Sequence, residues 1–161
     1  MEERRQEEHE LMEQEALEWN EALREGTGWE QEKREDSSFG GKNGQGKLYL
    51  CSTPIGNLDD ITLRVLDTLK RVDLIAAEDT RHSIKLLNHF HIKTPMTSYH
   101  EYNKVEKARY LVEQLKKGVN IALVTDAGTP GISDPGEELV RQCHEAGVEL
   151  TSLPGPAACI T

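Results

Sequence analysis

The regular alternation of short apolar runs with helical patterns from Lys47 onward restricts the fold more than any other feature. Five apolar runs are predicted to be strands, at residues 48–51, 74–77, 95–99, 119–124 and 148–153. The four segments between them have helical patterns, over about 60–69, 80–90, 103–117 and 135–146. Strands that alternate with helices form parallel sheets through right-handed crossovers. The sequence therefore predicts an α/β fold with a parallel-rich five-stranded sheet and flanking helices.

Capping residues set the expected helix boundaries. Asp60 is expected to cap the first helix, and Asn103 opens the third with Glu106 three residues later, as in a capping box. Asp134 followed by Pro135 is the pattern of an N-cap with proline at the first helical position.

The segment from Val124 to Gly136 is the most unusual connection in the chain. It is made of small and turn-forming residues and takes about ten positions, whereas strand-to-helix loops usually take about 2–6. Glycines let the backbone approach a ligand closely, and a helix start offers unpaired N–H donors. The sequence therefore indicates a binding loop at this strand end, although an ordinary connection is the alternative.

Four other polar or glycine-containing segments also follow predicted strands. They lie at residues 53–57, 78–82, 100–103 and 154–158, and the loop from Asp126 is the fifth such segment. A parallel sheet gathers the segments after its strands at one edge, which is where α/β proteins bind small molecules. None of them has the G-x-G-x-x-G dinucleotide fingerprint, which argues against a standard nicotinamide or flavin fold.

The first 46 residues differ in composition from the rest. They hold 14 acidic and 6 basic side chains, a net charge of −8 out of the chain's −10. Residues 1–25 are glutamate-rich with a thin apolar stripe, which predicts a partly formed exposed helix or a partner-binding helix, and residues 26–46 have a flexible linker's composition. We therefore expect an acidic, flexible or partly helical tail at 1–46 and an α/β domain at 47–161.

Residues 41–47 have the G-x-x-x-x-G-K spacing of a phosphate-binding P-loop, but the motif does not fit that function. Leu48 stands where a P-loop has the metal-binding Ser or Thr, and the glycines precede the first strand instead of following one. We interpret the segment as linker.

Composition excludes several classes of protein. No run approaches the roughly 18 apolar residues of a membrane span, and the N-terminus lacks a signal peptide's apolar core. Three widely separated cysteines fit reduced thiols, so we expect a cytoplasmic protein. The histidines have no cysteine partners at metal spacing, so no metal site is expected.

The same five segments resemble the bacterial 16S rRNA 2′-O-cytidine methyltransferases, whose fold belongs to the tetrapyrrole-methylase class. The resemblance covers residues 47–161 and consists of Thr-Pro-Ile-Gly-Asn-Leu at 53–58, Ala-Ala-Glu-Asp-Thr-Arg-His at 76–82, Asp-Ala-Gly-Thr-Pro at 126–130, Ser-Asp-Pro-Gly at 133–136 and Pro-Gly-Pro at 154–156. It matches only the family's N-terminal domain, so the chain is expected to be truncated before the C-terminal domain and inactive alone.

The resemblance implies S-adenosylmethionine as cofactor and 16S rRNA in the small ribosomal subunit as substrate. It also implies a homodimer in the full-length form. Carried over position by position, the implied cofactor-binding residues are Pro54, Ile55, Gly56, Asp126, Ala127, Gly128, Gly131, Ala157 and Ala158.

Methyl transfer to a 2′-hydroxyl should benefit from a positioned base, because that hydroxyl is weakly acidic. Glu78, Asp79 and His100 are the candidates at the predicted sheet edge, and Arg81 could bind an RNA phosphate. The alternative is that Asp79 only caps the following helix and pairs with Arg81. The sequence leaves open whether these residues are catalytic or whether Asp79 is only a helix cap.

RNA as substrate rests on the resemblance, because residues 47–161 hold 13 basic and 15 acidic side chains. Five basic residues on one helix form either a patch or a solvated face: Lys104, Lys107, Arg109, Lys116 and Lys117. Two other functions therefore stay open, a methylase acting on small tetrapyrroles and a non-catalytic fragment with a binding or self-association role.

Overall fold

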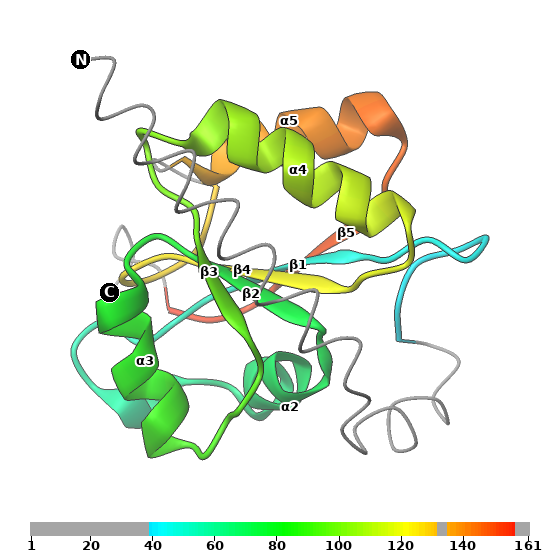
Figure 1. Ribbon diagram of the computed structural model, residues 1–161. Coiled ribbons are helices and arrows are strands. Elements are labelled where there is room, and N and C mark those ends of the chain that lie inside the picture. The colour runs from blue at the N-terminus through cyan, green and yellow to red at the C-terminus, as the bar shows by residue number, and fades with distance from the viewer. Residues whose placement is uncertain (1–38, 132–134, 157–161) are drawn as a thin grey trace. The chain divides into compact units, whose positions relative to one another are not determined.

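The computed structural model of the 161-residue chain describes residues 39–131 and 135–156 (Figure 1). Along these residues five strands alternate with four α-helices and one short 3₁₀ helix. Their bounds are β1 (Leu48–Cys51), η1 (Leu58–Asp60), α2 (Leu63–Arg71), β2 (Leu74–Ala77), α3 (Thr80–His89), β3 (Met96–Ser98), α4 (Lys104–Lys116), β4 (Ile121–Val124), α5 (Gly136–Ala146) and β5 (Leu150–Leu153). The predicted α/β alternation is confirmed.

The strands form one fully parallel sheet in the order β3-β2-β4-β1-β5. From β1 to β3 the chain moves toward one edge, and from β3 to β5 it moves back toward the other. Right-handed crossovers in opposite directions place their helices on opposite faces of the sheet. Accordingly α2 and α3 cover one face, and α4 and α5 cover the other (Figure 1).

The inner strands are buried on both faces, which explains their continuous apolar sequences. All residues of β1, β2 and β4 are buried, and both faces of the sheet contribute to the core. Leu48, Ile75 and Leu123 are at most 1% exposed. None of the described helices is long and apolar enough to cross a bilayer.

The first helix begins later than the sequence suggested. Asp60 does not cap it, because this residue ends the 3₁₀ helix, whose own cap is Asn57. The hydroxyl of Thr62 caps α2 instead, by accepting a hydrogen bond from the backbone N–H of Val65 at 3.2 Å. The motif at 53–58 therefore leads into a 3₁₀ turn before α2, which was not predicted from the sequence.

The other two expected caps have different outcomes. Asn103 is at the N-cap position of α4 but makes no capping bond, because its side chain accepts the backbone N–H of His100 at 2.8 Å. Asp134 lies outside the described residues. The left-handed Gly147 ends α5, with φ of +69°.

Residues 39–46, expected to belong to the linker, pack against the sheet. Phe39 stacks on the Tyr49 ring with a centroid separation of 4.9 Å, and the guanidinium of Arg71 lies 4.1 Å from the Phe39 centroid. The backbone N–H of Gly46 donates to the carbonyl of Leu115 at 2.7 Å. The compact unit accordingly starts at Phe39, and the predicted tail helix lies outside the described residues.

Two of the three cysteines, Cys51 and Cys143, are buried as free thiols. Burial raises the pKa of each thiol to about 12, so both stay protonated and unreactive at neutral pH. Both therefore serve as small core side chains.

Candidate functional site

The connection after β4 runs in the opposite direction to those after β1 and β2, the two strands that flank it in the sheet. The chain leaves β1 and β2 toward helices on one face, and it leaves β4 toward α5 on the other (Figure 1). In open α/β sheets ligands bind beyond the carboxyl ends of the strands, at such a reversal. The loop after β4, residues 125–131, is therefore the natural centre of a site.

On one side this loop is paired with the segment after β1. Thr53 and Gly128 form an isolated antiparallel bridge, with N–H to carbonyl distances of 2.9 and 3.1 Å. The Thr53 hydroxyl also donates to the carbonyl of Thr125 at 3.2 Å. Gly128 has φ of +87°, a region that L side chains rarely adopt. The loops after β1 and β4, which the sequence predicted to share one edge of the sheet, are thus joined by backbone hydrogen bonds.

On its other side the loop contacts the segment after β2. The backbone N–H of Asp126 donates to the Glu78 carboxylate at 3.4 Å, and the backbone N–H of Glu78 donates to the carbonyl of Val124 at 3.3 Å. Glu78 is half-buried and Asp126 is exposed. The candidate base Glu78 is therefore attached to the candidate cofactor loop.

The segment after β5 joins the same cluster through two hydroxyl groups. Ser52 donates to the carbonyl of Leu153 at 3.2 Å, Thr129 donates to the carbonyl of Pro156 at 3.0 Å, and the two hydroxyl oxygens lie 2.9 Å apart. Each hydroxyl has one proton, so these three contacts share two protons. When one hydroxyl donates to the other, it no longer donates to its carbonyl.

The approach of this segment requires a glycine. A Cβ atom on Gly155 would lie 2.5 Å from the Cβ of Ser52, closer than side chains can pack. The middle residue of the Pro-Gly-Pro motif therefore has a steric function.

The described residues that are expected to bind the cofactor lie in the loops after β1 and β4. Pro54 and Gly128 are buried, Ile55 and Gly131 are half-buried, and Gly56, Asp126 and Ala127 are exposed. A Cβ on Gly128 would lie 3.6 Å from Ile55 Cδ1 and 3.7 Å from the carbonyl oxygen of Pro156, so the three loops meet there. Ala157 and Ala158 lie outside the described residues.

Asp79 makes both contacts that the alternative interpretation expected. Its Oδ1 accepts the backbone N–H of Arg81 at 2.9 Å, which caps α3, and its Oδ2 lies 3.1 Å from Arg81 Nη2. The hydrogen bonds from Arg81 lower the pKa of the Asp79 carboxyl and raise the pKa of Arg81. A carboxylate held in this way is a weak base.

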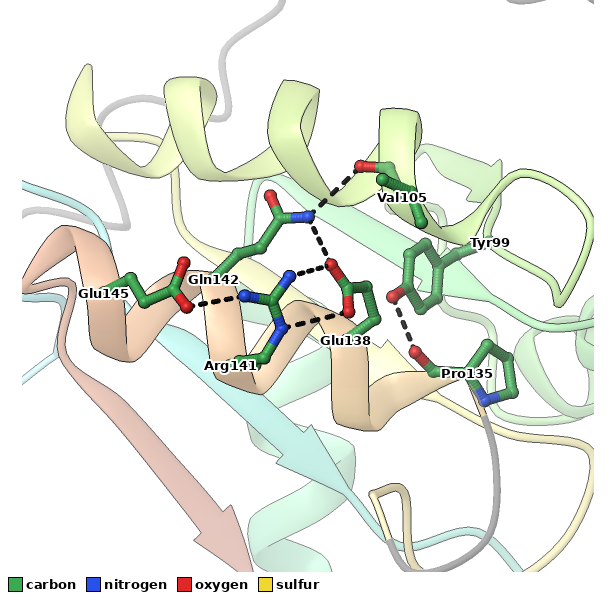
Figure 2. A network of polar contacts seen from close by, with 7 residues as sticks. All are labelled: Tyr99, Val105, Pro135, Glu138, Arg141, Gln142 and Glu145. Carbon is green, nitrogen blue, oxygen red and sulfur yellow. Dashed lines mark hydrogen bonds and ion pairs between the residues drawn. The ribbon is translucent and has the colours of Figure 1, made fainter.

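The loop after β3 is tied to the start of α5. The hydroxyl of Tyr99 donates to the carbonyl of Pro135 at 2.6 Å (Figure 2), and the backbone N–H of Tyr99 donates to Ala77 at 2.7 Å. The next residue, His100, has a buried Nδ1 without a hydrogen-bond partner among the described residues. His100 is therefore the candidate base with an uncommitted nitrogen.

A polar network fixes α5 against α4. Arg141 pairs with Glu138 and Glu145 on its own helix, and Gln142 donates to both Glu138 and the carbonyl of Val105 on α4 (Figure 2). The hydrogen bonds from Arg141 and Gln142 lower the pKa of the Glu138 carboxyl. The network holds the helix whose first turn Tyr99 contacts.

Residues 47–161 match the family model described as Tetrapyrrole (Corrin/Porphyrin) Methylases. The chain belongs to this family. The chain is 62% identical over 116 residues to a Haemophilus influenzae protein named Ribosomal RNA small subunit methyltransferase I, and 53% identical over 128 residues to the Bacillus subtilis protein of that name. These matches cover 72% and 80% of the chain but only 41% and 44% of the relatives' own lengths.

Solved structures support the fold of the methylase domain. Uroporphyrin-III-C-methyltransferase from Thermus thermophilus matches with a TM-score of 0.56 at 20% identity, over 71% of this chain and 48% of that chain. A diphthine synthase matches with a TM-score of 0.57 at 15% identity, over 70% and 45%. At these identities the likeness concerns the fold alone.

Sequence reasoning missed the hydroxyl groups that hold the methylase loops together. Ser52 and Thr125 directly precede recognised motifs and are buried, and Thr129 lies within one of these motifs. Their position after an apolar strand was a signal, because a buried hydroxyl needs a partner.

The basic residues of α4 do not form one surface patch. Lys107 is 4% exposed and lies 5.6 Å from the Tyr110 ring centroid. Lys104 and Lys116 each pair with a glutamate on the protein surface. Among the described residues no three His, Cys, Asp or Glu side chains are placed to hold a metal ion.

Proposed function

We propose that residues 47–161 are the N-terminal domain of an S-adenosylmethionine-dependent methyltransferase that modifies the 2′-hydroxyl of a cytidine in 16S rRNA. The names of the close relatives support the reaction and the substrate. The pairing of Thr53 with Gly128 carries the proposal, because it assembles the resembled cofactor motifs where α/β sheets bind ligands. The chain spans about 41% of the Haemophilus relative, so the complete activity needs the remaining part.

The residues at the junction fit S-adenosylmethionine. Gly128 and Gly131 have φ of +87° and +85°, which leaves the loop without bulky side chains where its backbone would face the ligand. The exposed Asp126 carboxylate suits a positively charged group, and a carbonyl released by Ser52 or Thr129 suits an amino group. The loops at 54–56, 126–131 and 157–158 would hold the cofactor, which supplies a methyl group on a sulfonium.

The proton of the attacking ribose hydroxyl would pass to His100 or Glu78 in preference to Asp79. The imidazole of His100 has a nitrogen without a hydrogen-bond partner among the described residues, whereas the Asp79 carboxylate already accepts three hydrogen bonds from Arg81. The exposed Arg81 guanidinium would bind an RNA phosphate near this edge.

A domain swap tests the proposal. Residues 47–161 replace the matching segment of the Haemophilus relative, and transfer of labelled methyl to small-subunit RNA is measured, with the unswapped relative as positive control. We expect transfer to one cytidine 2′-oxygen. The 161-residue chain alone should transfer methyl far more slowly, because an incomplete site loses preorganisation. A stable swapped protein that binds S-adenosylmethionine but leaves the RNA unmodified would contradict the proposal.

Variants of the swapped protein separate the candidate bases. Single-turnover transfer should slow about 10²–10⁴-fold in His100→Gln or in Glu78→Gln, whichever is the base, with cofactor affinity unchanged. A cytoplasmic location and a homodimer of the full-length protein complete the proposal.

A further inference from the structure

Tyr102 is the most exposed large apolar side chain among the described residues, at 89%. It lies in the turn between β3 and α4, at the carboxyl edge of the sheet. Its ring meets the His100 ring edge-on, with centroids 6.0 Å apart and an angle of 65° between the planes. An aromatic ring in this position presents its face to solvent at substantial hydration cost.

The turn that carries Tyr102 is held by hydrogen bonds on both sides. The backbone N–H of His100 donates to Asn103 Oδ1 at 2.8 Å, and the backbone N–H of Asn103 donates to the His100 carbonyl at 3.1 Å. The fully buried Tyr99 anchors the turn to β2 and to the start of α5. A ring on a fixed turn loses little conformational entropy when it binds a partner.

Tyr102 is also close enough to the candidate site to contact the same substrate. β3 is separated from β4 by one strand, so the ends of β3 and β4 lie roughly 10 Å apart. The loop after β4 leads into α5, whose N-cap residue Pro135 is bonded to Tyr99. This separation suits a nucleotide next to the one being modified.

Charge favours stacking over a phosphate groove at this position. The domain has no basic excess, with 13 basic and 15 acidic residues over 47–161. Beside Tyr102, the charge of Glu101 is compensated by Lys104 at 2.5 Å. Base stacking on an aromatic ring does not depend on net charge, and single-stranded RNA is commonly held in this way.

We propose that Tyr102 is a stacking platform for an RNA base adjacent to the target cytidine. This inference rests on the proposed function and adds a substrate contact that the motifs do not contain. The ring fixes the flanking base, and the ribose of the target nucleotide is thereby directed toward the loop after β4.

Binding of a labelled single-stranded oligoribonucleotide to the 161-residue chain tests the platform. Tyr102→Leu should weaken binding about 5- to 100-fold, the change that corresponds to ~1–3 kcal/mol for one stacked base. Tyr102→Phe keeps the ring and should bind like the parent. His91→Asn is the matched control, because it removes an exposed ring beyond the C-terminal end of α3, at the opposite edge of the sheet, and asparagine tolerates the positive φ of 55° there.

Equal affinities of the parent and Tyr102→Leu would overturn the platform, as would an undetectable affinity of the parent. The swapped enzyme separates this failure from a failure of the proposed function. Tyr102→Leu should raise its KM for RNA about 5- to 100-fold while cofactor affinity stays unchanged. Unaltered methylation by Tyr102→Leu would refute only the platform, whereas a swapped parent that methylates no RNA would refute the proposed function.

Discussion

Thr53 and Gly128 exchange both of their backbone hydrogen bonds, although they lie in loops that follow different strands, β1 and β4. The bridge continues the β1–β4 pairing beyond the sheet in the opposite sense, because the loop after β4 turns back toward β1. Glu78 holds the same loop from the β2 side through Asp126. The loop is thus held from both neighbouring strands.

Gly128→Val should weaken S-adenosylmethionine binding by the swapped enzyme and lower the stability of the chain. The cause is backbone strain at φ of +87°, since the space for a Cβ is ordinary at 3.6 Å. A branched residue in this region costs on the order of 1–3 kcal/mol. Calorimetric titration with the cofactor measures the first effect and thermal unfolding the second. Gly128→Asn is the control, and it should retain more affinity because asparagine adopts positive φ more easily.

The hydroxyls of Ser52 and Thr129 should be energetically coupled. Ser52→Ala and Thr129→Val each remove one proton from three shared contacts, and each should cost about 0.5–1.5 kcal/mol of unfolding free energy. The double variant should differ from the sum of the single variants by at least about 0.5 kcal/mol, as expected for residues in one network. Denaturant unfolding of all four proteins gives the cycle. Strict additivity would show that the two hydroxyls act independently.

Gly155→Ala should destabilise the chain by about 1–3 kcal/mol, because its methyl group would lie 2.5 Å from the Cβ of Ser52. Ser52→Gly removes that Cβ, so the Ser52→Gly, Gly155→Ala double variant should recover part of the loss relative to Ser52→Gly alone. Thermal unfolding of the four proteins measures this. If Gly155→Ala lowers stability equally with serine and with glycine at position 52, the contact with the Ser52 Cβ is not the cause of the loss.

Asp79→Asn isolates the charge of the α3 cap, because asparagine caps helices about as well as aspartate. Arg81 lowers the pKa of Asp79 in the folded chain below the unfolded value of about 3.9. A lowered carboxyl pKa stabilises the folded state above the unfolded pKa, and this contribution is lost as the pH falls through the folded pKa. The parent should therefore melt above the variant at pH 6 and approach it near pH 2. The swapped enzyme with Asp79→Asn should keep its methyl-transfer rate, and a large loss would restore Asp79 as a candidate base.

The alternation of patterns was sufficient to predict the strands, because each inner strand is a continuous apolar run buried on both faces. The edge arrangement of the motif loops followed from parallel topology. Contacts between the loops could not be predicted in this way. Nothing in the sequence pairs Ser52 with Thr129, or Asp126 with Glu78, because these contacts depend on strand order, and the order β3-β2-β4-β1-β5 is set by tertiary packing. Asp60 was misassigned because Asn57 and Thr62 supply competing caps three and two residues away.

The boundary of the folded unit gives a last prediction, through two truncated chains. One begins at residue 39 and the other at residue 47, so they differ only by residues 39–46. The longer chain keeps the stacking of Phe39 between Tyr49 and Arg71, and it keeps the Gly40 N–H bond to the Tyr49 hydroxyl at 2.9 Å. It also keeps Gly46, whose Cα is packed so tightly that a Cβ would lie 1.8 Å from the Val119 carbonyl oxygen.

Loss of one partly buried aromatic side chain and of two backbone hydrogen bonds should cost roughly 2–4 kcal/mol. The shorter chain should therefore unfold at a clearly lower denaturant concentration. Phe39→Leu in the longer chain is the control, and it should account for only part of the difference. Equal midpoints for the two truncations would show that the domain begins at Lys47 and that residues 39–46 only lie on its surface.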